Sequence, residues 1–343
     1  MSIIHELLKT IEIGSSTTFE NLTMYPLLGT SEQKLEYITL DEALAAETAS
    51  VTEVSESGSV PDLLFRNDGD IPVLLLDGEE LIGAKQNRVL NLSILAPANK
   101  TITIPVSCVE AGRWSRQTPE FQSSGRSMYA RGRAAKVAQV SMSMRSGHSR
   151  SDQSEVWRDI SEKAERMSVA SDTQAMSDIY ESRGEKLGEY LTRFETAEHQ
   201  VGAMFEIDGT VAGLDLFDKE TTLSRVLPKL VRSFALDAVE VSGGEKKEAS
   251  NERAARFIGL MVDAAVEQFP AAGLGEDLRL AGQSVSGGAL NVDGAIVHLY
   301  AFPARSARNS ETPDGGRSRI RRASMRRATE RRRDRASREP EDD

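Results

Sequence analysis

Short apolar runs separated by turn-forming residues fill the first third of the chain, and this spacing limits the folds it can adopt. Between residues 11 and 112 the runs recur too closely for long helices, and they suit short strands joined by tight turns. Asp77-Gly78, which lies between two such runs, is a two-residue hairpin signal because both turn positions favour a positive φ. We therefore predict a strand-rich region over residues 1–112, built as a sandwich or a rolled sheet.

The second half of the chain changes to helical spacing. Apolar residues fall on single helical faces between residues 152 and 265, and Asp-Gly pairs at 208–209 and 293–294 mark further hairpins. This order predicts an α+β fold in which the strand-rich half is followed by helices packed on a smaller antiparallel sheet, residues 151–302. We expect the two regions to form one integrated domain.

Two segments carry positive charge on a chain whose net charge is −11. Residues 113–150 hold eight Lys and Arg against one Glu, and we predict a basic Ser/Gly/Arg insertion that is either functional or a mobile loop. Its Gly-rich turns and Arg side chains suit phosphate groups. Residues 303–343 hold 13 Arg and few large apolar residues, which predicts a disordered Arg-rich tail that either aids solubility or contacts nucleic acid.

The cysteine content and the lack of long apolar runs indicate where such a chain would reside. Its single cysteine, Cys108, excludes an intramolecular disulfide and fits a reducing compartment. We find no apolar leader at the N-terminus and no run near the ~20 apolar residues of a membrane helix, so we predict a cytoplasmic protein with no membrane partner. Cys108 itself is read as a buried structural thiol, with a nucleophile beside a cation as the alternative.

Several common types of site are not indicated by the sequence. The four histidines are scattered and none has a second ligand at metal-binding spacing, so no metal site is predicted. Neither a phosphate-binding P-loop nor a dinucleotide-binding glycine fingerprint is present. His298 lies within a strand-like run and reads as a hydrogen-bonded strand residue rather than a general base. The sequence does not indicate which cofactor, if any, the protein uses.

The most distinctive stretch runs from Asp77 to Arg88. Alternation along its exit strand places Gln86 and Arg88 on the same face as apolar residues that follow, so the guanidinium is expected to be buried. A buried guanidinium needs a partner, because an unpaired buried charge costs several kcal/mol. That partner is either a carboxylate (Glu79, Glu80 or Glu110), which makes a structural ion pair, or a ligand.

A second stretch, Glu110-Ala111-Gly112-Arg113-Trp114, ends another strand-like run. It offers a carboxylate, a guanidinium and an indole, which could serve as an acid/base group, an anion donor and a stacking surface. The alternative interpretation is a salt-bridged strand end with a core tryptophan.

Both stretches also resemble a known family. Leu75 to Arg88 and Ile104 to Trp114 are similar to the first of the ARG and Rhodanese-Phosphatase-superfamily-associated protein domains, over roughly residues 10–302. The family is uncharacterised, and its name records gene-neighbourhood association with ADP-ribosylglycohydrolases and with rhodanese and phosphatase domains. The resemblance thus implies a role in NAD or ADP-ribose metabolism, with no catalytic residues to carry over.

Three functions follow as hypotheses. The first is a binding domain or enzyme for an ADP-ribose-like or other nucleotide-derived phosphate ligand, the second a non-catalytic protein interaction module, and the third a nucleic-acid binder that uses the Arg-rich segments. Whether the protein is an enzyme is left open. In the first hypothesis Arg88 and Arg113 would hold phosphate, and Gln86 and Asn87 would hydrogen-bond the ligand. Glu80 or Glu110 would act as the acid/base group, and Trp114 would stack on the ligand.

Overall fold

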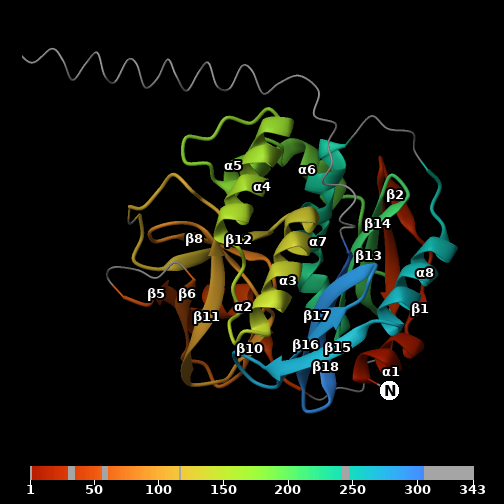
Figure 1. Cartoon of the computed structure of the whole chain (residues 1–343), viewed down its shortest axis with the longest axis horizontal. Coiled ribbons are helices and arrows are strands. Elements are labelled where there is room, and N and C mark those ends of the chain that lie inside the picture. The colour runs from red at the N-terminus through yellow and green to blue at the C-terminus, as the bar shows by residue number, and fades with distance from the viewer. Residues whose placement is uncertain (1, 30–34, 56–60, 116, 242–246, 305–343) are drawn as a thin grey trace, which may run out of the picture. The chain divides into compact units, whose positions relative to one another are not determined.

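A computed structural model describes residues 2–29, 35–55, 61–115, 117–241 and 247–304 of the chain. Contacts divide the chain into two units, residues 1–304 and residues 305–343, and the described residues all belong to the first. The predicted Arg-rich tail lies outside the described residues from Arg305 onward. The described part is a mixed α+β structure with a strand-rich N-terminal half, as the sequence predicts (Figure 1).

The N-terminal half folds mainly into a closed six-stranded barrel. The strand order around the barrel is β11-β6-β5-β12-β8-β9, so the predicted rolled sheet is found. A small sheet of order β10-β7-β4 lies beside it. The bounds of these strands are β4 Ile38–Thr39, β5 Ala49–Glu53, β6 Asp62–Asn67, β7 Val73–Leu75, β8 Glu79–Gly83, β9 Arg88–Leu90, β10 Ile94–Ala96, β11 Lys100–Cys108 and β12 Phe121–Ser127.

The second half contributes most of a nine-stranded antiparallel sheet, in the order β1-β3-β13-β14-β18-β17-β16-β15, with β2 paired to β3. Strands from the start of the chain complete it, so the two halves are interleaved. The bounds are β1 Glu12–Ile13, β2 Thr17–Phe19, β3 Leu22–Leu28, β13 Gln200–Ile207, β14 Thr210–Phe217, β15 Ala265–Pro270, β16 Glu276–Ala281, β17 Val285–Val292 and β18 Ala295–Pro303.

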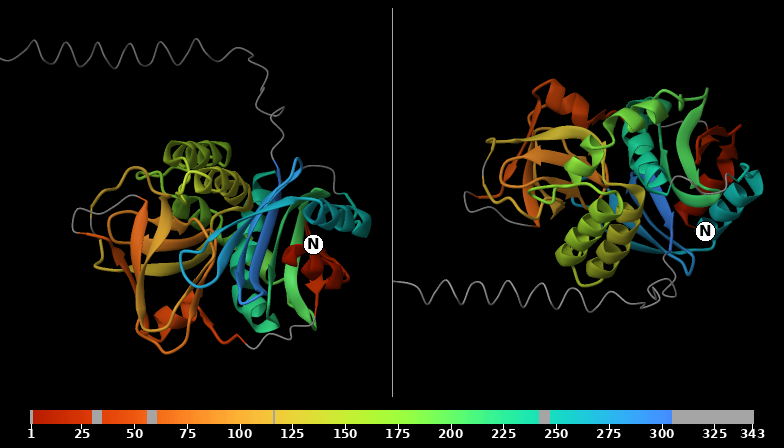
Figure 2. Two further views of the ribbon diagram at one scale, coloured as in Figure 1. Left: turned by 60° about the horizontal axis from the view of Figure 1, so that its bottom comes forward. Right: turned by 90° about the horizontal axis from the view of Figure 1, so that it is seen from above.

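Helices α3 and α7 lie along the junction of the barrel and the large sheet (Figure 2). Helix α7 contacts β12 of the barrel and β13 and β14 of the sheet, and α3 contacts β14, β17 and β18. Among the described helices, none combines the length and the apolar character that a membrane span requires. The helices are α1 Ile3–Thr10, α2 Leu40–Ala45, α3 Ala130–Met144, α4 Gln153–Arg166, α5 Met176–Glu181, α6 Gly184–Leu191, α7 Glu220–Glu240 and α8 Asn251–Val262.

Two of the three Asp-Gly hairpins are confirmed. Asp208 and Gly209 have φ values of 49° and 68°, Asp293 and Gly294 have 51° and 82°, and each pair joins antiparallel neighbours. The prediction of a hairpin at Asp77-Gly78 is wrong, since β7 pairs with β10 and β4 while β8 pairs with β12 and β9. Of these two residues only Gly78 has a positive φ, which glycine adopts readily, and a Cβ at this position would lie too close to Ser127 and Arg133, at 2.9 and 3.0 Å.

Residues 113–150 do not form a long loop. They contain strand β12, which closes the barrel between β5 and β8, and the 15-residue helix α3. Several of their basic residues are buried in ion pairs, namely Arg113, Arg133 and Lys136. Three of the eight basic residues of this segment are therefore neutralised inside the fold, which weakens the case for a nucleic-acid surface here.

Candidate functional site

The stretch from Asp77 to Arg88 supplies three different environments. Asp77 and Glu79 enter ion pairs at the junction of the barrel and the large sheet. Glu80 lies fully buried behind strand β12, and Arg88 lies inside the barrel. The sequence prediction of one site built from this stretch therefore separates into three groups, each of which has its own chemistry.

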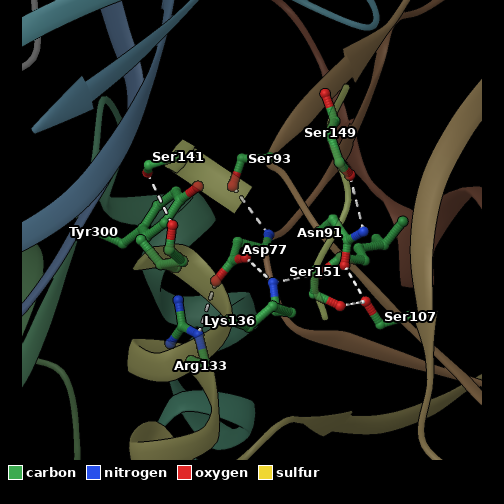
Figure 3. A network of polar contacts seen from close by, with 12 residues as sticks. Asp77, Asn91, Ser93, Ser107, Arg133, Lys136, Ser141, Ser149, Ser151 and Tyr300 are labelled. Atoms are coloured by element: carbon green, nitrogen blue, oxygen red, sulfur yellow. Dashed lines mark hydrogen bonds and ion pairs between the residues drawn. The ribbon is translucent and has the colours of Figure 1, made fainter. Parts of the chain in front are cut away.

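The junction holds a buried network of charges (Figure 3). Arg133 of α3 bonds Asp215 of β14 through both terminal nitrogens, at 3.0 and 2.7 Å, and its Nε lies 3.2 Å from Asp77. Lys136, one helical turn further on, also donates to Asp77. Burial alone would raise the pKa of Asp215, but Arg133 and His298 hold it down to about 2. Opposite charges are matched, as buried charges require.

This network includes a serine, a histidine and an aspartate in a row. Ser93 Oγ lies 2.7 Å from His298 Nδ1, and His298 Nε2 lies 3.2 Å from Asp215. The three residues are at most 3% exposed, Asp215 is engaged by Arg133, and Ser93 already accepts a bond from the Asp77 amide. A substrate cannot reach a serine in this position, so the row is structural, as the sequence indicates for His298.

The barrel interior holds Arg88 with Gln86 and Cys108. Arg88 Nη1 donates to Gln86 at 2.9 Å and to the Cys108 sulfur at 2.7 Å. Burial raises the pKa of Cys108 to about 11 although Arg88 opposes it, so the thiol is protonated at neutral pH and unsuited to nucleophilic attack. The guanidinium carbon of Arg88 lies 5.8 Å from the centre of the Trp114 ring, and Trp114 is 50% exposed at this end of the barrel.

Glu110 and Arg113 form a closed, buried pair. Arg113 bonds both Glu110 oxygens, at 2.8 and 2.6 Å, and its remaining N–H groups donate to the carbonyls of Ala84, Ser115 and Gly83 and to the Asn87 amide oxygen. Every nitrogen of this guanidinium is thus occupied by protein acceptors. Glu110 in turn accepts a hydrogen bond from the backbone N–H of Asn87 at 3.0 Å, so the Glu110–Arg113 pair fixes the loop that carries Asn87.

A cleft lies on the outer side of strand β12, where the strand pairing with β8 shifts between Ser123 and Ser127. Two hollows of about 440 and 280 Å³ adjoin along this bulge and share Ser124, Arg126 and Glu181. We call them together the β12 cleft. The larger hollow is also lined by Arg232 of α7 and by α6, and the smaller one by Asn87. Such volumes suit small ligands.

Arginine side chains from two elements meet in the larger hollow. Arg126 makes only long bonds, 3.3 Å to the Ser177 carbonyl and 3.4 Å to Glu181, whose side chain is 64% exposed. Arg232 donates to the Gly125 carbonyl at 3.0 Å, and both burial and the nearby Arg126 lower its pKa. Arg126 and Arg232 outnumber Glu181, the carboxylate that lines this hollow with them, and an anion would relieve the repulsion between the two cations.

Glu80 is the least satisfied acid of the described residues near this cleft. It is fully buried, and neither carboxylate oxygen makes a hydrogen bond of ordinary geometry. Burial raises its pKa to about 7, while Ser124 and Arg126 oppose the shift. A buried carboxyl with a pKa near neutrality is a group that exchanges protons under physiological conditions.

Replacing Glu80 with glutamine should change how stability depends on pH. A raised folded-state pKa means that wild-type stability falls as pH rises from about 4.5 to about 7, because the folded protein must give up a proton it holds more tightly. The difference in unfolding free energy between Glu80→Gln and the wild type should therefore shift by about 1–3 kcal/mol in favour of the variant from pH 5 to pH 8. Urea unfolding at both pH values measures this.

The exposed Glu165→Gln substitution on α4 is the matched control and should follow the wild type at both pH values. If Glu80→Gln also followed the wild type, Glu80 would not be the perturbed acid.

The structure thus places the seven predicted site residues in three places. Asn87 lines the cleft, with Glu80 behind it; Glu110 and Arg113 support Asn87; and Gln86, Arg88 and Trp114 occupy the barrel end. Sequence reasoning missed Arg232, because it lies within an ordinary helical stripe. Arg126 belongs to the basic segment noted for its phosphate chemistry, but nothing singled it out.

Among the described residues no group of three or more His, Cys, Asp and Glu side chains could hold a metal ion.

Comparisons with known proteins identify a family and no function. Searches of curated proteins and of solved structures found no match. A family model matches residues 10–302, a span that includes the barrel, the large sheet and the cleft. The chain belongs to the family of ARG and Rhodanese-Phosphatase-superfamily-associated Protein domains.

Proposed function

We propose that this protein binds a phosphate-bearing, nucleotide-derived small molecule in the β12 cleft. The observation that carries the proposal is the pairing of Arg126 and Arg232 in one hollow, where the carboxylate that pairs with Arg126 is the weakly held, exposed Glu181. Arginine is suited to phosphate because its planar N–H groups match two phosphate oxygens at once.

A serine hydroxyl at the bulge supports an anion site. Ser123 and Ser124 accept bonds from the amides of Gly125 and Arg126, at 3.2 and 3.1 Å. The Ser124 hydroxyl, which accepts a bond, keeps its own proton to donate, and Ser124 lines both hollows.

The two hollows differ in a way that suits the parts of a nucleotide. The larger one is lined by Gly184 and Gly188, four residues apart on α6, and by Leu187 and Leu191, which leaves a shallow apolar wall for a planar group. The smaller one is lined by amide and hydroxyl side chains that suit ribose hydroxyls: Asn87, Gln117, Thr118, Gln122 and Ser177. Arg126 lies where the two hollows meet.

ADP-ribose is the first ligand to test, because it combines an adenine, two riboses and a pyrophosphate, and because the family's name points toward ADP-ribose metabolism. In this proposal Arg126 and Arg232 take the phosphate-binding role predicted for Arg88 and Arg113. Asn87 keeps its predicted contact with the ligand, and Glu80 keeps its predicted role as the proton-exchanging group.

Calorimetric titration of the full chain with ADP-ribose, NAD and ADP tests the proposal. A ligand at ~100 times its Kd should also raise the unfolding free energy by about 2.7 kcal/mol. Because a hydrogen bond to a charged group is worth about 1.5–3 kcal/mol, Arg126→Ala and Arg232→Ala should each weaken binding by roughly 10- to 100-fold.

Arg158→Ala, which removes an exposed arginine on α4, is the matched control and should bind as the wild type does. Absence of binding by all three ligands, or wild-type affinity in both cleft variants, would rule out the proposed site.

A further inference from the structure

Glu80 lies directly behind the strand that forms the wall of the β12 cleft. We propose that Glu80 takes up a proton when the phosphate group enters, so that the protein binds its anionic ligand and a proton together. This inference rests on the proposed function and adds to it a group that sets how binding responds to pH.

The position of Glu80 follows from strand pairing. Glu80 belongs to β8 and lies opposite Val89 of β9, while β8 pairs on its other edge with β12. The next residues of β8, Leu81 and Ile82, lie opposite Ser123 and Gln122 of β12. Ser124, which lines both hollows, is the polar side chain that most affects the Glu80 carboxyl. Ser124 therefore links the Glu80 carboxyl to the cleft.

Charged and titratable groups around Glu80 come from β12, from α5 and from the residues after β11. Arg126 of β12 is the cation, Glu181 of α5 and Glu110 after β11 are the anions, and Tyr180 of α5 also interacts with it. Among the described residues, the charged groups named as acting on Glu80 are therefore one cation and two carboxylates. Ser124 and the Arg126 cation both favour the ionised form of Glu80.

Arg126 is the group that the ligand would engage. When a phosphate group binds Arg126, it offsets the cation that favours ionised Glu80 and brings a further negative charge near it. Both effects favour the protonated carboxylic acid. In the free protein burial places the pKa of Glu80 at about 7, so near neutral pH a substantial fraction of molecules can accept this proton.

The uptake of a proton makes affinity depend on pH with a definite sign. Below the pKa of free Glu80 the carboxyl is already protonated, and pH has little effect on binding. Between this pKa and the higher pKa of Glu80 in the complex, binding includes protonation, so affinity falls as pH rises. Above both pKa values Glu80 is ionised in the free and the bound protein, and affinity no longer changes with pH. A glutamine at this position has the shape of the protonated acid and does not titrate.

The test is calorimetric titration of the full-length protein with ADP-ribose at about pH 6 and about pH 8, in buffers of different ionisation enthalpy. The pyrophosphate of ADP-ribose does not titrate in this range, so the probe adds no proton of its own. A shift of one unit in the pKa of Glu80 on binding would weaken wild-type affinity by up to about tenfold between the two pH values. The binding enthalpy near pH 7.5 should vary with the buffer, because protons are taken up.

Glu80→Gln should bind with one affinity at both pH values, equal to that of the wild type at the lower pH, and its binding enthalpy should not depend on the buffer. Glu267→Gln, at an exposed position on β15, should keep the wild-type pH dependence. Wild-type binding without pH dependence, or the same dependence in Glu80→Gln, would overturn this inference alone. No wild-type binding at either pH would overturn the proposed function and the inference with it.

Discussion

Arg133→Ala should lower the unfolding free energy by about 3–5 kcal/mol, the cost expected when one partner of a buried ion pair is removed. Arg133 holds Asp215 with two bonds and Asp77 with a third, and all three side chains are at most 1% exposed. Without Arg133, Asp215 keeps only His298 as a partner with possible positive charge, and its carboxylate stays out of reach of water. Chemical denaturation at neutral pH measures the loss.

The control for Arg133 is Arg145→Ala, because Arg145 also makes two bonds to one carboxylate, that of Glu267, but at the surface. This variant should be indistinguishable from the wild type, since exposed pairs are weakened by water. Equal effects of the two substitutions would mean that burial does not set the strength of the Arg133 contacts.

Arg113→Ala should cost a similar amount, about 3–5 kcal/mol, and for a related reason. The substitution leaves Glu110 buried without its cation and removes donors from the carbonyls of Gly83, Ala84 and Ser115. Burial favours the neutral form of Glu110, but Arg113 and the Asn87 amide lower its pKa below the usual range. Ionised Glu110 therefore contributes stability at neutral pH, and the loss in Arg113→Ala should shrink as pH falls and Glu110 becomes protonated.

Unfolding curves of Arg113→Ala at about pH 4.5 and pH 7 measure this difference. Arg66→Ala, which breaks an exposed pair with Asp68, is the control for a general effect of losing an arginine. A variant with wild-type stability and lost ligand affinity would instead support the sequence-based assignment of Arg113 as a phosphate-binding residue.

The strand-rich half and the two confirmed hairpins were predictable because their signals are local. Turn geometry at residues 208–209 and 293–294 is set by the turn residues themselves, which accept positive φ. Asp77-Gly78 has the same dipeptide sequence, yet the strands on either side of it pair with other strands and not with each other. There the aspartate is held by Arg133 and Lys136 from a distant helix, and no local pattern reports such a contact.

Strand β12 and helix α3 were missed because their buried faces do not follow the usual apolar pattern. β12 is rich in serine and is held by backbone pairing to its neighbours, so it shows little alternation of apolar and polar residues. α3 turns Arg133 and Lys136 toward the interior beside Val137 and Val140. A helix whose buried face includes charged residues reads as a basic loop when only hydrophobicity is considered.

The candidate cleft was only partly predictable for the same kind of reason. Glu80 and Asn87 stood out because they belong to a distinctive stretch of sequence. Arg126 and Arg232 are more than a hundred positions apart and meet only because α7 packs against β12. No local pattern in the sequence links these two residues.

The charge network at the junction also bears on how the molecule can move. Separating the barrel from the large sheet would pull Arg133 away from Asp77 or Asp215 and leave charges unpaired in a dry interior. Hinge motion between these two parts is therefore costly, and helix α7, which touches both, adds a second restraint. A ligand would enter the β12 cleft through local swings of long side chains such as Arg126 and Glu181, on the fast timescale of rotamer changes, rather than through closure of one half on the other.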